Sequence, residues 1–192
     1  VVALRARPSE EEIVRVIDWG YATDGCPGMC LWFVCLTDGS AICFDEYVFS
    51  QTLPEQVCDE IKRRSAGMRV RYTTCDPQMA TEHEGPSIME HFARYGVSCV
   101  EADHNRVPGW LTFHQWLRET RHNGVSEYPR LRYLKHGCPL AIRTIPVMTV
   151  DPKKPEDIIT TGVEDEAADC SRYFVMSRPG SSSLKAQPNP NT

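Results

Sequence analysis

The sequence lacks the features that define several common protein classes. Its longest purely apolar run is the eight residues 29–36, whereas about 20 are needed to span a bilayer, so we exclude a membrane-spanning helix and expect no membrane partner. It contains no GxxxxGK[ST] segment, which excludes a P-loop ATPase. It also contains no CxxC, HxH or HExxH pattern, so the ligand spacings typical of zinc sites are missing.

The chain also has no excess of positive charge. The 192 residues include 21 Lys and Arg against 26 Asp and Glu, for a net charge of -5. Domains that hold nucleic acid mainly through charge are usually basic, so that class is disfavoured, although an enzyme with acidic residues gathered at a metal site remains open. The nine cysteines are an odd number, and several lie in apolar runs. This usage favours reduced thiols in a cytosol-like compartment.

Length and local composition predict one folded domain with two polar ends. Residues 1–12 contain Pro8 and an acidic run, and we expect them to form a leader or linker before the folded domain at 13–178. Residues 179–192 are rich in Ser, Pro and Asn, with almost nothing apolar to bury, so we expect a disordered tail. Because the chain opens on Val1 instead of Met, we expect it to be a piece of a longer protein.

The first third of the domain predicts an antiparallel meander of three strands. Residues 13–19, 29–36 and 41–49 are rich in β-branched and other apolar side chains, and turn-prone segments separate them. Helical periodicity then alternates with short strands, which predicts an α/β domain. Helices are expected at 54–66, 86–95, 108–120 (with Leu111, His114 and Leu117 on one face), 139–145 and 164–176, strands at 68–75, 97–100 and 131–134, and a polar loop at 151–162.

Carboxylates occur near the ends of two predicted strands and at the start of the last helix. Asp18 is near the end of a strand that is otherwise expected to be buried, where an ionised carboxylate without a partner is strongly unfavourable. Asp76 follows a second strand in the same way. On the last helix, Asp165 and Asp169 are four residues apart and therefore share a face. Mg²⁺ and Mn²⁺ prefer hard oxygen ligands, so together these residues predict a divalent-metal site.

Each of these acidic groups also has a structural explanation when taken alone. Acidic residues in the first turn of a helix interact favourably with the helix dipole, which accounts for residues 164–166 without any chemistry. The Asp76-Pro77 pair is a common way to start a turn. Only the joint placement of the carboxylates on this order of elements favours a metal site over separate structural roles.

Three segments carry a more specific pattern. They are Ile17-Asp18-Trp19-Gly20-Tyr21, Cys75-Asp76-Pro77 and the Asp-x-Ala-x-Asp-x-x-Arg-Tyr sequence that begins at Asp165. Together they resemble the nuclease domain of large terminase subunits, the DNA-packaging motors of tailed bacteriophages, over most of residues 13–178. The resemblance implies an RNase H-like (RuvC-like) fold, in which a central mixed sheet of three antiparallel strands and then parallel strands is flanked by helices.

The resemblance also implies an activity and a set of site residues. The activity is that of a metal-dependent, largely sequence-nonspecific endonuclease, which cuts concatemeric viral DNA by two-metal phosphodiester hydrolysis with Mg²⁺ or Mn²⁺. By position, Asp18, Asp76 and Asp165 correspond to catalytic metal ligands and Asp169 to a further ligand. Many relatives have Asp-His where this chain has Asp165-Glu166. The supporting acidic residues are Asp24, Glu46 and Glu166.

An acidic site needs basic groups nearby to hold DNA. We expect Arg106, Lys153 and Lys154 to contact the DNA backbone, because they lie in predicted loops near the strand ends where this fold places its site. Such contacts are independent of sequence and sensitive to salt. The implied partners are double-stranded DNA, a terminase ATPase domain that precedes residue 1, the small terminase subunit and the portal protein, in the host cell cytoplasm.

Two other readings stay open at this stage. The first is a different RNase H-like nuclease, such as a junction resolvase or an enzyme that cuts RNA–DNA hybrids. The second is a non-catalytic module that docks on the packaging motor. Substrate comparisons separate the first from a terminase nuclease, and the second predicts no cleavage with either metal.

Overall fold

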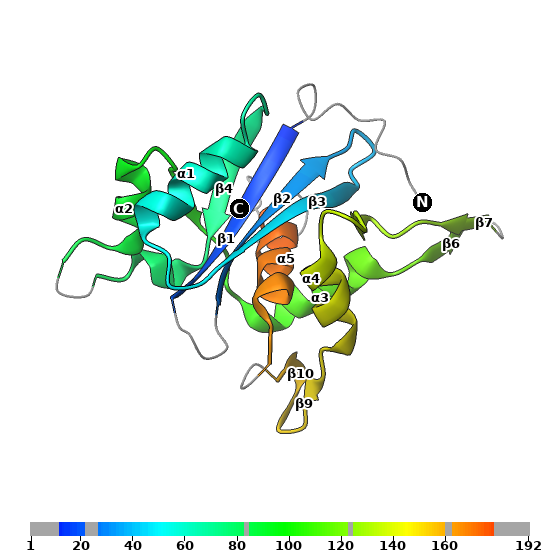
Figure 1. Ribbon diagram of the computed structural model, residues 1–192. Helices are drawn as coiled ribbons and strands as arrows, with labels where there is room; N and C mark the ends of the chain where they lie inside the picture. Colours follow the sequence, from blue (N-terminus) through cyan, green and yellow to red (C-terminus); the bar gives the residue numbers. More distant parts are fainter. Residues whose placement is uncertain (1–11, 22–26, 83–84, 123–124, 160–162, 179–192) are drawn as a thin grey trace, which may run out of the picture.

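The computed structural model describes residues 12–21, 27–82, 85–122, 125–159 and 163–178, and its centre is a six-stranded sheet. The strands lie in the order β5-β4-β1-β2-β3-β8 (Figure 1). Their bounds are Glu12–Tyr21 for β1, Pro27–Cys35 for β2, Ala41–Phe49 for β3, Val70–Cys75 for β4, Val100–Glu101 for β5 and Leu131–Tyr133 for β8. The predicted tail and residues 1–11 of the predicted leader lie outside the described residues.

The sheet is mixed, as predicted. Strands β1, β2 and β3 pair antiparallel in sequence order, whereas β4 is parallel to β1, β5 to β4 and β8 to β3. The turn between β2 and β3 contains Gly39, whose φ of 81° is a left-handed conformation that glycine adopts without steric cost. The prediction of three antiparallel strands followed by parallel strands is therefore confirmed.

Helices cover both faces of this sheet (Figure 1), and side chains of β1 alternate between the two cores. Ile13 and Ile17 pack in one core, and Val14 and Val16 in the other. The first core lies under α1 (Pro54–Arg64) and α2 (Ile88–Arg94), and the second under α3 (Arg106–Leu117), α4 (Pro139–Thr144) and α5 (Glu166–Met176). Strands buried on both faces need apolar residues throughout, which explains the continuous apolar run of β2.

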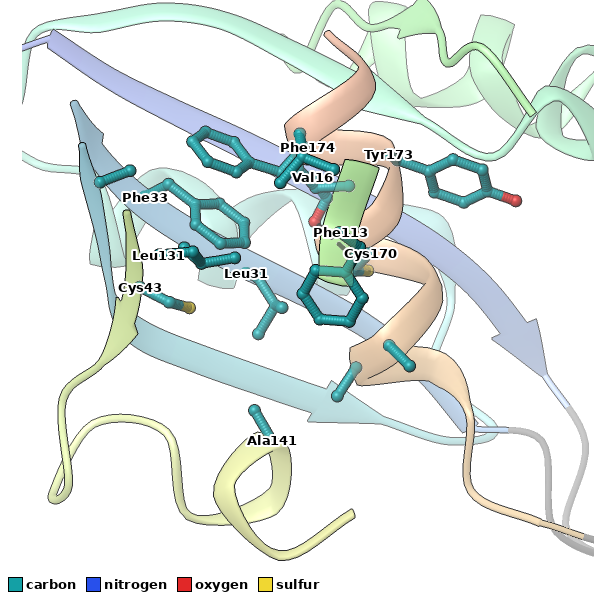
Figure 2. Packing of buried hydrophobic residues seen from close by; sticks show 14 of the residues in the cluster. Val16, Leu31, Phe33, Cys43, Phe113, Leu131, Ala141, Cys170, Tyr173 and Phe174 are labelled. Atoms are coloured by element: carbon teal, nitrogen blue, oxygen red, sulfur yellow. Dashed lines mark hydrogen bonds between the residues drawn. The ribbon is translucent and has the colours of Figure 1, made fainter. Parts of the chain in front are cut away.

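Helix α5 is anchored across the second face by aromatic packing. Figure 2 shows Phe174 and Phe33 in the core between this helix and the sheet. Their rings stack at 3.9 Å, and the ring of Trp116 from α3 meets Phe174 edge-on at 5.9 Å. All three side chains are buried. This packing fixes the carboxy-terminal part of α5 against the sheet, and the rigid helix carries its acidic residues from there.

The structure corrects the prediction for the third helix. Helix α3 runs from Arg106 to Leu117 and not over 108–120. Pro108 is tolerated because it lies in the first turn, where backbone N–H groups have no intrahelical partner. The predicted apolar face is also wrong, since Leu111 is 61% exposed and His114 is exposed. The large rings of the neighbouring stripe, at Trp110, Phe113 and Trp116, are buried instead.

The prediction of a polar loop at 151–162 is wrong in part. It contributes to a hairpin of β9 (Val150–Asp151) and β10 (Lys154–Ile158). A second hairpin joins β6 (Thr120–His122) to β7 (Val125–Glu127), and the short strand expected at 97–100 is found at Val100–Glu101. Short polar hairpins lack the alternation of apolar residues on which strand prediction depends.

Among the described residues, no helix combines the length and apolar character needed to cross a membrane.

A candidate metal-binding site of carboxylates

Asp18 and Asp76 lie side by side at the ends of neighbouring parallel strands. Strand β1 pairs with β4 so that Ile17 is opposite Cys75. The backbone N–H of Asp76 donates to the carbonyl of Ile17 at 2.9 Å, which continues the pairing by one residue. The two carboxylates, 58 positions apart in the sequence, are therefore brought together by the ladder of backbone hydrogen bonds, as the strand-end argument predicts.

The amino-terminal end of α5 approaches the same edge of the sheet. The Tyr173 hydroxyl donates to Oδ2 of Asp76 at 3.2 Å, and the Cys170 thiol lies 4.0 Å from the carbonyl oxygen of Val16. Asp165 is the residue before the first turn of α5, and Asp169 follows one turn later, with its N–H donating to the carbonyl of Asp165 at 2.9 Å. The helix thus adds its acidic residues to those of the strands.

These carboxylates repel one another strongly. Burial raises the pKa of Asp18 well above its usual value, and the charges of Asp76, Asp169, Asp165 and Glu166 raise it further. Burial and then the charge of Asp169 raise the pKa of Asp165 to about 6. Five acidic side chains therefore act on each other at this edge of the sheet, and the closeness raises the free energy of the ionised state.

Glu166 is the most unusual member of this group. Its side chain is only 4% exposed, and neither carboxylate oxygen has a hydrogen-bond partner among the described residues. Burial first, and then the charge of Asp165, raise the pKa of Glu166 to about 7. A buried carboxylate without donors is costly in free energy. The two carboxylate oxygens of Glu166 are therefore potential metal ligands without a hydrogen-bond partner among the described residues, and they lie beside the oxygens of other carboxylates.

Asp169 differs from the other carboxylates because two arginines compensate its charge. Nε and Nη2 of Arg172 donate to Oδ1 of Asp169 at 3.0 and 2.9 Å, and Nη1 of Arg106 lies 3.7 Å from Oδ2. Arg172 is 1% exposed, and it fits because Gly109 of α3 has no side chain. A Cβ there would lie 2.8 Å from Cγ of Arg172. Asp169 is thus held in place by charge-assisted hydrogen bonds.

A cleft of about 370 Å³ opens beside these groups. Its lining includes Asp76, Asp169, Arg106, His104 and Tyr173. The sequence singled out neither His104 nor the contact of Tyr173 with Asp76, because both depend on the positions of loops and helices. The Arg-Tyr end of the α5 pattern was the available signal for Tyr173 and Arg172.

One of the predicted supporting residues, Glu46, has a different set of partners. Glu46, on β3, accepts hydrogen bonds from the backbone N–H groups of Leu140 and Ala141, at 2.6 and 3.1 Å. These groups lie in the first turn of α4, so Glu46 stabilises a helix terminus. The structure therefore places Glu46 in a structural position. Asp24 lies outside the described residues.

The predicted DNA-contacting residues lie next to the cleft. Lys153 and Lys154 are exposed on the β9–β10 hairpin and line a shallow hollow of about 570 Å³ together with Arg106 and Asp157. Arg106 lines both the hollow and the cleft. It therefore lies between the hollow that holds the two lysines and the cleft that holds Asp76 and Asp169.

The donor chemistry of the site fits divalent cations, although the side chains do not enclose an ion as they stand. Within the described ranges, no group of three or more His, Cys, Asp or Glu side chains forms a ready cage. The oxygens of Asp18, Asp165 and Glu166 are nevertheless desolvated and mutually repelled, and those of Glu166 have no donor. Hard cations such as Mg²⁺ and Mn²⁺ prefer such oxygens.

The sheet order, the helices on both faces and the acidic strand ends together define an RNase H-like fold, which confirms the predicted fold class. No family model and no curated protein sequence matches the chain. Among solved structures, the chain is similar to the nuclease domain of g2p, the large terminase of bacteriophage SPP1, in a crystal structure with bound Mn. The TM-score is 0.58 at 14% sequence identity, with 85% of this chain and 84% of that domain covered. At this identity the similarity shows the shared fold.

Proposed function

We propose that this chain is a metal-dependent DNA endonuclease domain of a viral packaging terminase, which cuts concatemeric DNA with little sequence preference. The observation that carries the proposal is the convergence of Asp18, Asp76 and Asp165, from three separate elements, at one edge of the sheet. The fold shared with a terminase nuclease domain whose crystal structure contains Mn gives this convergence a functional context.

In this proposal, Asp18, Asp76 and Asp165 hold two divalent cations, Mg²⁺ or Mn²⁺, with Glu166 and Asp169 beside them. When bound, such cations activate water and stabilise the leaving oxygen in phosphodiester hydrolysis. The hydroxyl of Tyr173 orients the carboxylate of Asp76, to which it donates at 3.2 Å.

Asp169 has a different place in the proposal from the other four acidic residues. Arg172 and Arg106 lie close to its carboxylate, so it orients these arginines at the site as well as contributing negative charge. Arg106, Lys153 and Lys154 hold the DNA backbone along the path from the hollow to the cleft. The partners of the domain are then double-stranded DNA, an ATPase domain, the small terminase subunit and the portal protein, in the host cell cytoplasm.

Plasmid digestion with Mn²⁺ or Mg²⁺ tests the proposal. We expect the wild-type protein to nick and linearise plasmid without sequence preference, and Asp18→Asn and Asp76→Asn to lose more than about 100-fold in cleavage rate, since loss of even a residue that supports a metal ligand costs 10- to 100-fold. Thermal unfolding checks that both variants remain folded.

A matched control and a substrate panel complete this experiment. Asp59→Asn removes an aspartate of α1 that is paired only with Lys62, at 2.9 Å, on the other side of the sheet, and it should cleave like the wild type. Four-way junctions and RNA–DNA hybrids report on the alternative RNase H-like activities. Absence of cleavage with either metal, or full activity in Asp18→Asn, would contradict the proposed site.

A further inference from the structure

Arg106 is held by an ion-pair network that the metal site itself does not require. Its Nε donates to both oxygens of Asp157, at 3.0 and 2.9 Å, and its Nη2 lies 2.9 Å from Oδ1 of the same residue. The Arg106 side chain is 33% exposed, and that of Asp157 is 15% exposed. One edge of the guanidinium is therefore bound to a largely buried carboxylate, while the rest of the group reaches the cleft.

Asp157 is itself fixed from two further directions. The indole Nε1–H of Trp110 and the backbone N–H of Ile158 each donate to Oδ1 of Asp157 at 2.8 Å. Although burial acts in the opposite direction, the hydrogen bonds from Arg106, Ile158 and Trp110 lower the pKa of Asp157 to about 2. Asp157 is therefore an ionised and immobile acceptor at neutral pH.

The indole ring of Trp110 adds a second constraint. It is 4% exposed, and the guanidinium of Arg106 lies 5.4 Å from its centroid. An arginine that is both stacked on an aromatic ring and bound to a carboxylate loses little further entropy when it binds another anion. The position of the guanidinium is thus determined before any ligand arrives.

The remaining guanidinium nitrogen, Nη1, is not bound to Asp157, and its position indicates the function of this arrangement. Nη1 of Arg106 lies 3.7 Å from Oδ2 of Asp169, which is within ion-pair range but too long for a hydrogen bond. The same guanidinium lines the cleft with Asp76 and the hollow with Lys153 and Lys154. Arg106 thus lies where a backbone that follows the lysines would enter the carboxylate site.

We propose that Asp157 is a positioning residue, which fixes the guanidinium of Arg106 so that it binds a phosphate oxygen of the DNA backbone next to the carboxylates. This inference rests on the proposed function for its ligand. Asp157 does not touch DNA; it acts through Arg106, with Trp110 as a second support. If the pair of Arg106 and Asp157 only fastened the β9–β10 hairpin to α3, breaking it would leave DNA binding unchanged.

Salt-dependent DNA binding separates these two roles. Binding of a fluorescent duplex is measured by anisotropy at several salt concentrations with Mg²⁺, in an Asp18→Asn background that prevents cleavage. One phosphate contact contributes about 0.9 to the slope of log affinity against log salt. We expect Arg106→Ala to lower the slope by about this amount and to weaken binding about tenfold, as for other charge-assisted hydrogen bonds.

Asp157→Ala should reproduce the smaller slope and the weaker binding, and the double variant should be no worse than Arg106→Ala alone. Trp110→Phe, which keeps a ring and removes the N–H, should fall between these variants and the parent. Glu156→Gln is the matched control, because it removes the same charge from an exposed neighbour and should leave the slope unchanged. Asp157→Asn, of nearly the same shape, covers the case in which Asp157→Ala does not fold.

Two results would overturn the inference. One is an unchanged slope in the folded Asp157 variants when Arg106→Ala lowers it, and the other is an unchanged slope in Arg106→Ala itself. Plasmid cleavage by the otherwise unaltered chain reports separately on the proposed function. Cleavage without the slope effect rejects the role of Asp157 alone, whereas the slope effect without cleavage rejects the nuclease and keeps the phosphate contact.

Discussion

The two faces of the sheet give the ionisable side chains of strand β1 different surroundings, and the contrast appears within three residues. Arg15 faces α1, where its Nε donates to Thr73 at 2.9 Å and its Nη1 to Ser65 at 3.2 Å. Asp18 faces α5, where burial and then the charges of other carboxylates raise its pKa. Glu166, at the same edge, has no hydrogen-bond partner among the described residues. Charged groups that serve the fold are paired, so this unpaired carboxylate indicates a role that an outside ligand completes.

Among the substitutions that test this contrast, Glu166→Gln is expected to change the free energy of unfolding most. Glutamine resembles the protonated acid, and burial with like charges raises the pKa of Glu166 from 4.5 to about 7. The wild type therefore loses stability as pH rises from about 4.5 to 7, and the loss is complete above 7. At pH 8 without metal, the variant should be more stable by up to about 3 kcal/mol.

Urea denaturation in EDTA at pH 4 and pH 8 measures this effect. The advantage of Glu166→Gln should be near zero at pH 4, where the wild-type side chain is protonated in both states. An equal advantage at both pH values would show that the gain does not come from the charge of Glu166.

A smaller effect of opposite sign is expected on the other face. Thr73→Val keeps the shape of the side chain but removes the hydroxyl that accepts from Arg15. Since Thr73 is 3% exposed, the guanidinium loses a buried partner, which should cost about 1–3 kcal/mol of unfolding free energy. DNA cleavage by the folded variant should be unchanged, and a large loss of activity would contradict the separation of the two faces.

The smallest effect is expected at the surface of α1. Asp59 and Lys62 form an ion pair of 2.9 Å whose side chains are 66% and 47% exposed. Exposed pairs contribute little because water and salt screen them. Asp59→Asn should therefore change the denaturation midpoint by no more than the error of the measurement, and a clear shift would mean that exposed charges also support this face.

The predictions from the sequence are confirmed where a pattern of residue types is contained within one helix or strand. The β-branched and apolar content of residues 13–19, 29–36 and 41–49, with the turn-prone segments between them, predicted the meander. The start of α5 with its acidic residues was predicted to within two residues. In both cases, the pattern is set by residues close together in the sequence, whereas the joint placement of Asp18 and Asp76 was predicted from their positions at strand ends.

The predictions failed where contacts between distant segments decide the outcome. Glu46 was predicted as a supporting site residue from the family resemblance alone, yet α4, more than 90 residues later, supplies its donors. The buried side of α3 is determined by which rings meet Arg172 and Phe174, and helical periodicity alone does not choose between adjacent stripes. Asp157 was missed because a lone acidic residue in a polar segment carries no local signal.

The place of α5 in chain order has a consequence for synthesis. Asp165 and Glu166 lie more than 140 residues after Asp18, so a ribosome must produce nearly the whole described chain before all the acidic groups can meet. Contacts of such long sequence separation also form slowly. Unfinished or truncated polypeptides would carry Asp18 and Asp76 without the rest of the set, so the group of carboxylates would stay incomplete until nearly the whole domain is made.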